Sequence, residues 1–142
     1  KLYLAGLKIK SPVGTLGHSD GDPVLHSITD AILGACKMGD IGQMFSDKSK
    51  KFKNVRSTIL LERVIKQTKL AGYFINNMDI NIITQTPKIQ KYKKKMIENI
   101  SKICEISKKQ INIKGKTTEK LGVIGKEKAV ACEVIVSIVK YD

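Results

Sequence analysis

The sequence contains few of the residues that mark membrane, secreted or disulfide-stabilised proteins. It has three cysteines, three prolines, three phenylalanines, four tyrosines and no tryptophan among 142 residues. No apolar run reaches the roughly 20 residues that cross a bilayer, and the longest candidate, residues 129–139, includes Glu133. The cysteines form no CxxC pair, which argues against a disulfide framework and an all-cysteine metal site. We expect a soluble protein that is not secreted, with Cys36, Cys104 and Cys132 in or near the core.

The charge balance is strongly basic, with 26 lysines and arginines against 13 acidic residues and a net charge of +13. Such an excess makes nucleic acids, anionic membranes and anionic small molecules candidate partners. Only Arg56 and Arg63 are arginines, so the guanidinium groups that read base edges are nearly absent, and few aromatic rings are available to stack on bases. The four lysines between residues 91 and 95 indicate a solvated helix face. We therefore expect neither a nucleic-acid nor a membrane partner, and keep a lysine-rich RNA-binding module as the alternative.

Hydrophobic periodicity divides the chain into alternating strands and helices, with no internal repeat and no linker. We expect a single domain over residues 1–142, because this length is enough for one core. Apolar residues at helical spacing predict helices, and apolar residues at alternate positions predict strands. A helix start is predicted at Asp22-Pro23 and again at Thr86-Pro87. The expected elements are a strand or hairpin arm at 2–10, helices at 23–39, 54–70 and 87–103, and strands at 73–84, 111–113 and 129–139.

The last predicted strand is apolar on both faces. Val134, Val136 and Ile138 would lie on one side, and Ile135 and Val139 on the other. A strand of this kind must be covered on both sides, yet three helices are enough for only one face of a small sheet. We therefore expect an α/β sandwich (α+β), in which about three helices cover one face of a small mixed sheet and a partner subunit packs on the other.

Both histidines and three aspartates lie in one short stretch, residues 17–30. Asp22 before a proline is typical of a helix N-cap. His26 and Asp30 are four residues apart on one helix face, so the carboxylate could orient the imidazole or both could meet one ligand. A calcium loop is excluded, because the glycine position of an EF-hand falls on Leu25. From spacing alone, an ordinary Asp/Gly turn and a structural histidine stay open beside a metal ligand.

A second polar stretch, residues 114–122, places Thr117, Thr118 and Glu119 among lysines after a predicted strand. Threonine hydroxyls bind phosphate, and a carboxylate can hold Mg²⁺ together with substrate phosphates. The GxxxxGK[ST] pattern of a P-loop is absent. A polar turn with a helix cap is the alternative interpretation of this stretch.

Several stretches taken together resemble the 2-C-methyl-D-erythritol 2,4-cyclodiphosphate synthase family. They are HSDGDPVLHSITDAILG at 18–34, GDIG at 39–42 with Phe45 and Asp47, and TTEKLG at 117–122, supported by QTPK at 85–88 and ACE at 131–133. The resemblance covers the whole chain and implies a lyase of non-mevalonate isoprenoid synthesis that forms a homotrimer with active sites between subunits. In this family the 2-phosphate of 4-diphosphocytidyl-2-C-methyl-D-erythritol 2-phosphate attacks the β-phosphate of its own diphosphate, which closes the cyclic diphosphate and releases CMP.

The resemblance implies site residues by position. His26 would be a zinc ligand and Glu119 would support a Mg²⁺ or Mn²⁺ ion on the diphosphate, while His18 and Thr117 would stabilise the transition state. The implied contacts to the phosphate and methylerythritol part are His18, Ser19, Asp40, Ile41, Gly42, Phe45 and Asp47. The implied contacts to the cytidine diphosphate part are Thr84, Gln85, Thr86, Pro87, Lys88, Ile89, Gln90, Lys116, Thr117, Thr118, Glu119, Val123 and Lys126.

The chain departs from the family at some of these positions. The family's other two zinc ligands lie in a Gly-x-Asp-x-His motif near its N-terminus, which this chain lacks, and we expect that motif in a segment before Lys1. Lys116, Val123 and Lys126 stand where the family has threonine, phenylalanine and arginine, and residues 45–49 are less acidic. An inactive relative that binds cytidine nucleotides therefore stays as a further alternative. The compartment implied is the plastid stroma, of an apicoplast or chloroplast, or the bacterial cytoplasm.

Overall fold

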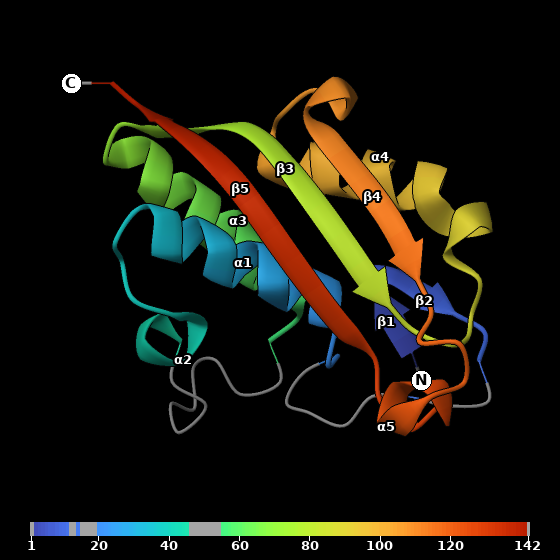
Figure 1. Cartoon of the computed structure of the whole chain (residues 1–142). Helices are drawn as coiled ribbons and strands as arrows, with labels where there is room; N and C mark the ends of the chain where they lie inside the picture. The colour runs from blue at the N-terminus through green and yellow to red at the C-terminus, as the bar shows by residue number, and fades with distance from the viewer. Residues whose placement is uncertain (1, 12–13, 15–19, 46–54, 142) are drawn as a thin grey trace.

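The computed structural model describes residues 2–11, 14, 20–45 and 55–141. Its longest helices lie on one face of a three-stranded sheet (Figure 1), which confirms the mixed α/β architecture. These helices are α1 (Pro23–Ala35), α3 (Ser57–Leu70) and α4 (Lys93–Cys104), and the strands are β3 (Tyr73–Ile83), β4 (Ile111–Lys116) and β5 (Ala131–Lys140). The shorter elements are the strands β1 (Leu2–Leu4) and β2 (Leu7–Ile9), the helices α2 (Ile41–Met44) and α5 (Gly122–Gly125), and the 3₁₀ turns η1 (Ile89–Tyr92) and η2 (Lys108–Gln110).

The N-terminal hairpin turns at Ala5 and Gly6, whose φ angles are 55° and 80°. Two consecutive left-handed residues match the twist of the flanking strands, and glycine adopts this conformation readily. Both turn amides donate to the Asp22 carboxylate, at 3.1 Å from Ala5 N to Oδ1 and 2.7 Å from Gly6 N to Oδ2. The hairpin predicted near residues 2–10 is confirmed, and a residue distant in the chain fixes its turn.

Helix α1 begins as predicted. The Asp22 carboxylate accepts the backbone N–H groups of Val24 and Leu25, both at 3.0 Å, and Pro23 has no N–H to satisfy. Leu25 and Ile28 have no exposed surface, so the apolar stripe read from the sequence faces the core. The same carboxylate therefore caps α1 and holds the hairpin turn.

The helix predicted to start at Thr86-Pro87 begins later, and that prediction is wrong. The Thr86 carbonyl accepts the Thr84 hydroxyl at 2.5 Å, and the Thr86 hydroxyl is buried without a hydrogen-bond partner among the described residues. Thr86 therefore caps no helix. The chain forms the turn η1 first, and only then α4. A polar residue before proline is equally common in turns, which is why the pattern misplaced the start.

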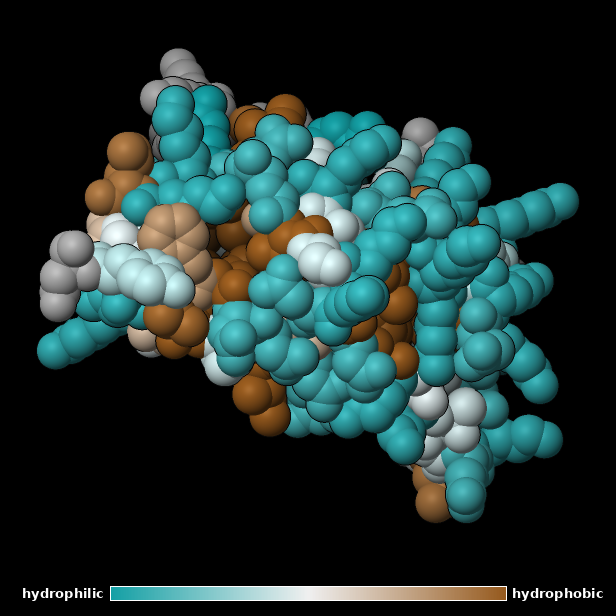
Figure 2. All heavy atoms as spheres, turned by 90° about the horizontal axis from the view of Figure 1, so that it is seen from above, coloured by the Kyte–Doolittle hydropathy of each residue, from teal (hydrophilic) through white to brown (hydrophobic). Residues whose placement is uncertain are grey.

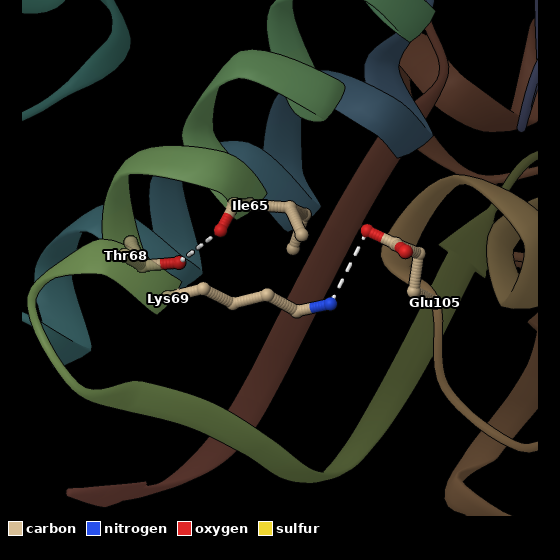
Figure 3. A network of polar contacts seen from close by, with 4 residues as sticks. All are labelled: Ile65, Thr68, Lys69 and Glu105. Carbon is tan, nitrogen blue, oxygen red and sulfur yellow. Dashed lines mark hydrogen bonds and ion pairs between the residues drawn. The ribbon is translucent and has the colours of Figure 1, made fainter. Parts of the chain in front are cut away.

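The C-terminal ends of α3 and α4 approach each other (Figure 3). Lys69 Nζ lies 3.2 Å from Glu105 Oε1, with side chains 36 % and 69 % exposed. Thr68 Oγ1 donates to the Ile65 carbonyl at 3.1 Å within α3. An exposed ion pair of this kind contributes about 0–1 kcal/mol, so the contact between the helices depends mainly on buried side chains such as Cys104.

Strand β3 is the centre of the sheet, parallel to β4 and antiparallel to β5. Its Ile80 and Ile82 side chains are fully buried beneath the helices, and alternate residues point to the opposite, outer face. On the outer face Ile135 of β5 is 76 % exposed, and Asp79 pairs with Lys114 at 2.7 Å. The helices therefore cover one face of the sheet, and the outer face stays open in a single chain.

The end of the molecule that carries the C-terminus is mostly polar, with some apolar side chains between the polar ones (Figure 2). Lys91, Lys94 and Lys95 are exposed and Lys93 is half-buried, so the solvated lysine face is confirmed for three of its four lysines. Cys36 and Cys104 are buried, as predicted. Within the described ranges, no helix combines the length and apolar character needed to span a bilayer.

Candidate active site

A cavity of about 290 Å³, here called the β3–β4 cavity, lies where these two strands end. Both strands run in the same direction and finish at this edge, the place where sheets of this kind commonly bind ligands. All but Lys93 and Gly115 of its lining residues are among the contacts that the resemblance implies for cytidine diphosphate. The lining residues are Thr84, Gln85, Pro87, Lys88, Ile89, Gln90, Lys93, Gly115, Lys116 and Thr117.

Gly115 allows the two walls of the cavity to approach closely. A Cβ atom at this position would lie 2.8 Å from the Ile89 Cβ atom, so a larger residue would push η1 away from β4. The Thr84 N–H donates to the Lys116 carbonyl at 2.9 Å, which extends the pairing of the strands to the cavity. Sequence reasoning missed Gly115, although a glycine inside a strand pattern signals close approach.

The cavity has a basic rim. Lys88 and Lys116 are exposed and Lys93 is half-buried, while the described lining residues include no carboxylate. Ammonium groups attract phosphates as point charges, so the cavity suits an anionic ligand. Sequence reasoning assigned Lys93 to the solvated lysine face, whereas the structure places it in the lining of the cavity.

A tight turn lies directly after the cavity wall that ends at Thr117. Glu119 and Lys120 are left-handed, with φ angles of 53° and 67°, a conformation that costs a non-glycine residue roughly 1–2 kcal/mol. Two threonine hydroxyls support the turn, because Glu119 N donates to Thr117 Oγ1 at 3.2 Å and Thr118 Oγ1 donates to the Leu121 carbonyl at 2.6 Å. The polar turn considered as an alternative therefore forms, and it leaves the Glu119 side chain exposed.

The three aspartates of residues 17–30 accept hydrogen bonds from backbone amides. Asp20 Oδ2 accepts the Ser57 N–H at 3.1 Å and Asp20 Oδ1 accepts the Ser57 hydroxyl at 2.5 Å, which caps α3 from a distant part of the chain. Asp30 Oδ1 accepts the Ile41 N–H at 2.7 Å at the start of α2, while Asp22 joins the hairpin to α1. The Asp/Gly turn considered for Asp20 and Asp22 therefore has structural roles, and Asp30 also accepts a backbone amide.

His26 lies in the first turn of α1 and is half-buried. In the ranges that the structure describes, no three His, Cys, Asp or Glu side chains are grouped to hold a metal ion. These residues offer zinc a single imidazole, fewer than the about three protein ligands of a catalytic zinc site, so they do not by themselves fit zinc. The predicted contacts His18, Ser19 and Asp47 lie outside the described residues.

The residues implied as methylerythritol contacts lie at the start of the short helix α2 and directly after it. Asp40 caps it in a capping box, with the Gln43 N–H 2.8 Å from Asp40 Oδ1. Ile41 and Gly42 open the helix, and Phe45 is buried behind it. Helix α2 packs beside α1, away from the ends of β3 and β4 that the cavity adjoins (Figure 1). One chain therefore does not bring the two predicted parts of the substrate site together.

The remaining implied contacts do not line the cavity. Thr86 and Thr118 are half-buried, Val123 is in α5, and Lys126 follows α5. Val123 is 60 % exposed. The structure thus places most of the predicted nucleotide contacts in the lining of one cavity.

Comparison with known proteins adds a family to this geometry. The chain matches the YgbB family over residues 1–139. The bifunctional enzyme IspD/IspF of Pelagibacter ubique is 76 % identical over 142 residues, which are 100 % of this chain and 38 % of that protein. The 2-C-methyl-D-erythritol 2,4-cyclodiphosphate synthase of Actinobacillus succinogenes is 42 % identical over 139 residues, 98 % of this chain and 88 % of that protein.

A solved structure gives the same result. The CDP complex of IspF from Plasmodium falciparum matches with a TM-score of 0.87 and 43 % identity, covering 99 % of this chain and 85 % of that one. The chain spans only 38 % of the length of the bifunctional relative, and most of the length of the single-activity synthase. The resemblance read from the motifs is confirmed: the chain belongs to the YgbB family, together with the 2-C-methyl-D-erythritol 2,4-cyclodiphosphate synthases.

Proposed function

We propose that the chain converts 4-diphosphocytidyl-2-C-methyl-D-erythritol 2-phosphate into 2-C-methyl-D-erythritol 2,4-cyclodiphosphate and CMP, as a phosphorus-oxygen lyase of non-mevalonate isoprenoid synthesis. The observation that carries this proposal is the β3–β4 cavity, whose basic rim and neighbouring Glu119 turn suit a nucleoside diphosphate with a metal ion. The complex of the P. falciparum relative with CDP supports a nucleotide ligand for this family.

The proposed reaction needs no nucleophile from the protein, because the substrate carries its own 2-phosphate. A bond forms from a 2-phosphate oxygen to the β-phosphorus while the bond from that phosphorus to the CMP oxygen breaks. The two phosphate groups repel each other, so both must be neutralised and held in line. Lys88, Lys93 and Lys116 supply positive charge at the cavity, the Thr117 hydroxyl can donate to a phosphate oxygen, and we assign His18 and Ser19 to the attacking phosphate.

Glu119 suits a magnesium or manganese ion by the chemistry of its donor atoms. Such an ion commonly binds one or two carboxylates together with substrate phosphates, and the Glu119 side chain is exposed at the tip of its turn. When bound, the ion would polarise the β-phosphate and offset the charge that develops on departing CMP. The role of the protein is to hold the Glu119 carboxylate at the place where the diphosphate arrives.

We propose a homotrimer in which the β3–β4 cavity of one subunit faces α2 of its neighbour. Two observations support this arrangement: the predicted parts of the substrate site lie apart in one chain (Figure 1), and the outer face of the sheet exposes Ile135 and Val139. Closed rings of identical subunits cover such faces without leaving an open edge. Light scattering should give about three times the chain mass of 15.7 kDa, and a monomer mass would contradict the arrangement.

We propose that His26 is one ligand of a zinc ion whose other ligands lie outside the described residues. Replacing His26 with alanine in the full-length protein should lower bound zinc, measured by elemental analysis, to about a tenth or less, because losing one of about three ligands weakens the site strongly. His18→Ala is the matched control, since His18 is assigned to the phosphate, and it should keep its zinc. Unchanged zinc in His26→Ala would refute the ligand assignment.

Release of CMP from the diphosphocytidyl substrate tests the proposed function. Full-length, metal-loaded protein should release CMP and the cyclic diphosphate in equal amounts, followed by chromatography. An inactive relative would bind CDP and release no CMP. An RNA-binding module would instead show RNA affinity that falls steeply with salt. Either result without CMP release would overturn the proposal.

We place the protein in the bacterial cytoplasm or a plastid stroma. The relatives from P. ubique and A. succinogenes are bacterial, and one structural relative comes from Plasmodium.

A further inference from the structure

We propose that Gln85 is a positioning residue for the metal-binding carboxylate: its side chain holds the Glu119–Lys120 turn against the β3–β4 cavity. The inference rests on the proposed function, in which Glu119 supports a metal ion on the diphosphate. It changes the role that the resemblance gives to Gln85, from a nucleotide contact to a bond between two parts of the protein.

The first observation is a hydrogen bond that joins the two walls of the cavity. Gln85 follows β3 on one wall, and its Oε1 atom accepts the Lys120 N–H at 3.0 Å, across 35 residues of sequence. Lys120 comes directly after Glu119, so the bond acts on the peptide unit that joins these two residues. The Gln85 oxygen therefore accepts a hydrogen bond from the protein backbone.

The second observation is the conformation of the turn. Glu119 and Lys120 both have positive φ angles, 53° and 67°, and such consecutive left-handed residues persist only when the surroundings hold them. The Thr117 and Thr118 hydroxyls bond within the turn and so shape it, yet bonds inside the turn cannot fix it relative to the opposite wall. The Gln85 bond does this, because it comes from that wall.

The third observation is the space behind the turn. A Cβ atom on Gly125 would lie 2.2 Å from the Lys120 carbonyl carbon and 2.7 Å from its Cα atom. The Lys120 backbone is therefore packed directly against Gly125 on one side and bonded to Gln85 on the other. A small shift of the Lys120 backbone would move the preceding Glu119 carboxylate, and misplacement by about 1 Å can cost a reaction about a hundredfold.

The test uses Gln85→Met, which keeps the length of the side chain and removes the acceptor. We expect the Mg²⁺ concentration for half-maximal CMP release to rise about tenfold, in proportion to the loss of one hydrogen bond. The affinity for CDP without metal, measured by calorimetry, should stay within about twofold, because the nucleotide keeps its other contacts. Gln67→Met, the same change at an exposed position on α3, should leave both quantities unchanged.

Two further variants separate positioning from general damage. Gly125→Ala should raise the Mg²⁺ requirement as Gln85→Met does, because the added methyl group would push on the Cα and carbonyl of Lys120, the residue whose N–H bonds to Gln85. In the Lys120→Gly background, Gln85→Met should raise the Mg²⁺ requirement less than it does in the wild-type background. Glycine adopts positive φ without outside support, so the turn then depends less on the Gln85 bond. Thermal unfolding of each variant identifies any that fails to fold. If Gln85→Met fails to fold, the Mg²⁺ requirement of Gly125→Ala provides the test instead.

The outcomes distinguish this inference from the proposed function. If the wild-type protein releases no CMP, the proposed function fails, and the effect of Mg²⁺ on CDP affinity then tests Gln85 in its place. If wild type is active and Gln85→Met keeps its Mg²⁺ requirement, the positioning role is wrong. Weaker CDP binding without any change in the Mg²⁺ requirement would also overturn it, because Gln85 would then contact the nucleotide directly.

Discussion

Glu119→Gln should lower the rate of magnesium-dependent CMP release by about a hundredfold or more, because an interaction that stabilises developing phosphate charge has an effect of this size. Glutamine preserves the shape of the side chain and removes its negative charge, so Mg²⁺ loses its protein ligand. The Glu119 side chain is exposed and outside the core, so the fold and the oligomer should be unaffected. Steady-state kinetics over a range of Mg²⁺ concentrations measure the effect.

Glu127→Gln is the matched control for this variant. Glu127 is also exposed and also has a positive φ angle, 61°, a short distance further along the chain. It lies outside the predicted site, and its replacement should leave the rate and the Mg²⁺ requirement unchanged. If Glu119→Gln kept the wild-type rate, or if it dissociated the oligomer, the metal-binding role would be wrong.

Asp22→Ala should lower the free energy of unfolding by about 3 kcal/mol or more, the scale expected when a buried, hydrogen-bonded charged group is removed. Four backbone amides donate to this carboxylate, two from the hairpin turn and two from the first turn of α1, and Asp22 has no exposed surface. Alanine leaves these donors without a partner. Urea unfolding followed by circular dichroism measures the change.

Asp30→Ala provides the comparison, since Asp30 is on the same helix and accepts a single amide at an exposed position. It should cost about 1 kcal/mol, as for the loss of an exposed helix cap. A loss in Asp22→Ala no larger than that in Asp30→Ala would contradict the role given to Asp22 at the junction of hairpin and helix.

The shifted pKa of Asp22 also makes the free energy of unfolding depend on pH. Burial raises the pKa of this carboxyl above its ordinary 3.8, and the amides of Leu25, Gly6 and Ala5 oppose the shift. The native state therefore binds the proton more tightly than the unfolded chain does. Protonation of Asp22 therefore adds to the free energy of unfolding. This contribution is complete below the pKa that Asp22 has in the unfolded chain, and it is lost as the pH rises through the higher pKa that Asp22 has in the native state.

Local patterns predicted the fold well where neighbouring residues decide the structure. The Asp22-Pro23 start of α1 is confirmed because the cap and the amides it accepts are adjacent in sequence. The strands β3 and β5 follow from alternating burial. Thr86-Pro87 offered the same kind of pattern and failed, because the Thr86 carbonyl accepts a hydrogen bond within a turn and the Thr86 hydroxyl caps no helix. A dipeptide pattern does not say which partners tertiary packing will supply.

The site was less accessible to sequence reasoning, because its key contacts join distant residues. The bond of Asp20 to Ser57 spans 37 residues and that of Gln85 to Lys120 spans 35, and no periodicity signals either. Most of the residues that line the cavity are among the nucleotide contacts that the resemblance implies. It could not show that α2 and the β3–β4 cavity lie apart in one chain, since that depends on how the helices pack on the sheet.

The carboxylates that join the hairpin, α1 and α3 have a consequence for hydrogen exchange. Asp20 and Asp22 are themselves linked, because the Asp22 N–H donates to Asp20 Oδ1 at 3.2 Å. Through them the amide hydrogens of Gly6 and Ser57, far apart in the chain, depend on the same short segment. These amides should therefore exchange with solvent deuterium at a common rate, as one cooperatively opening unit.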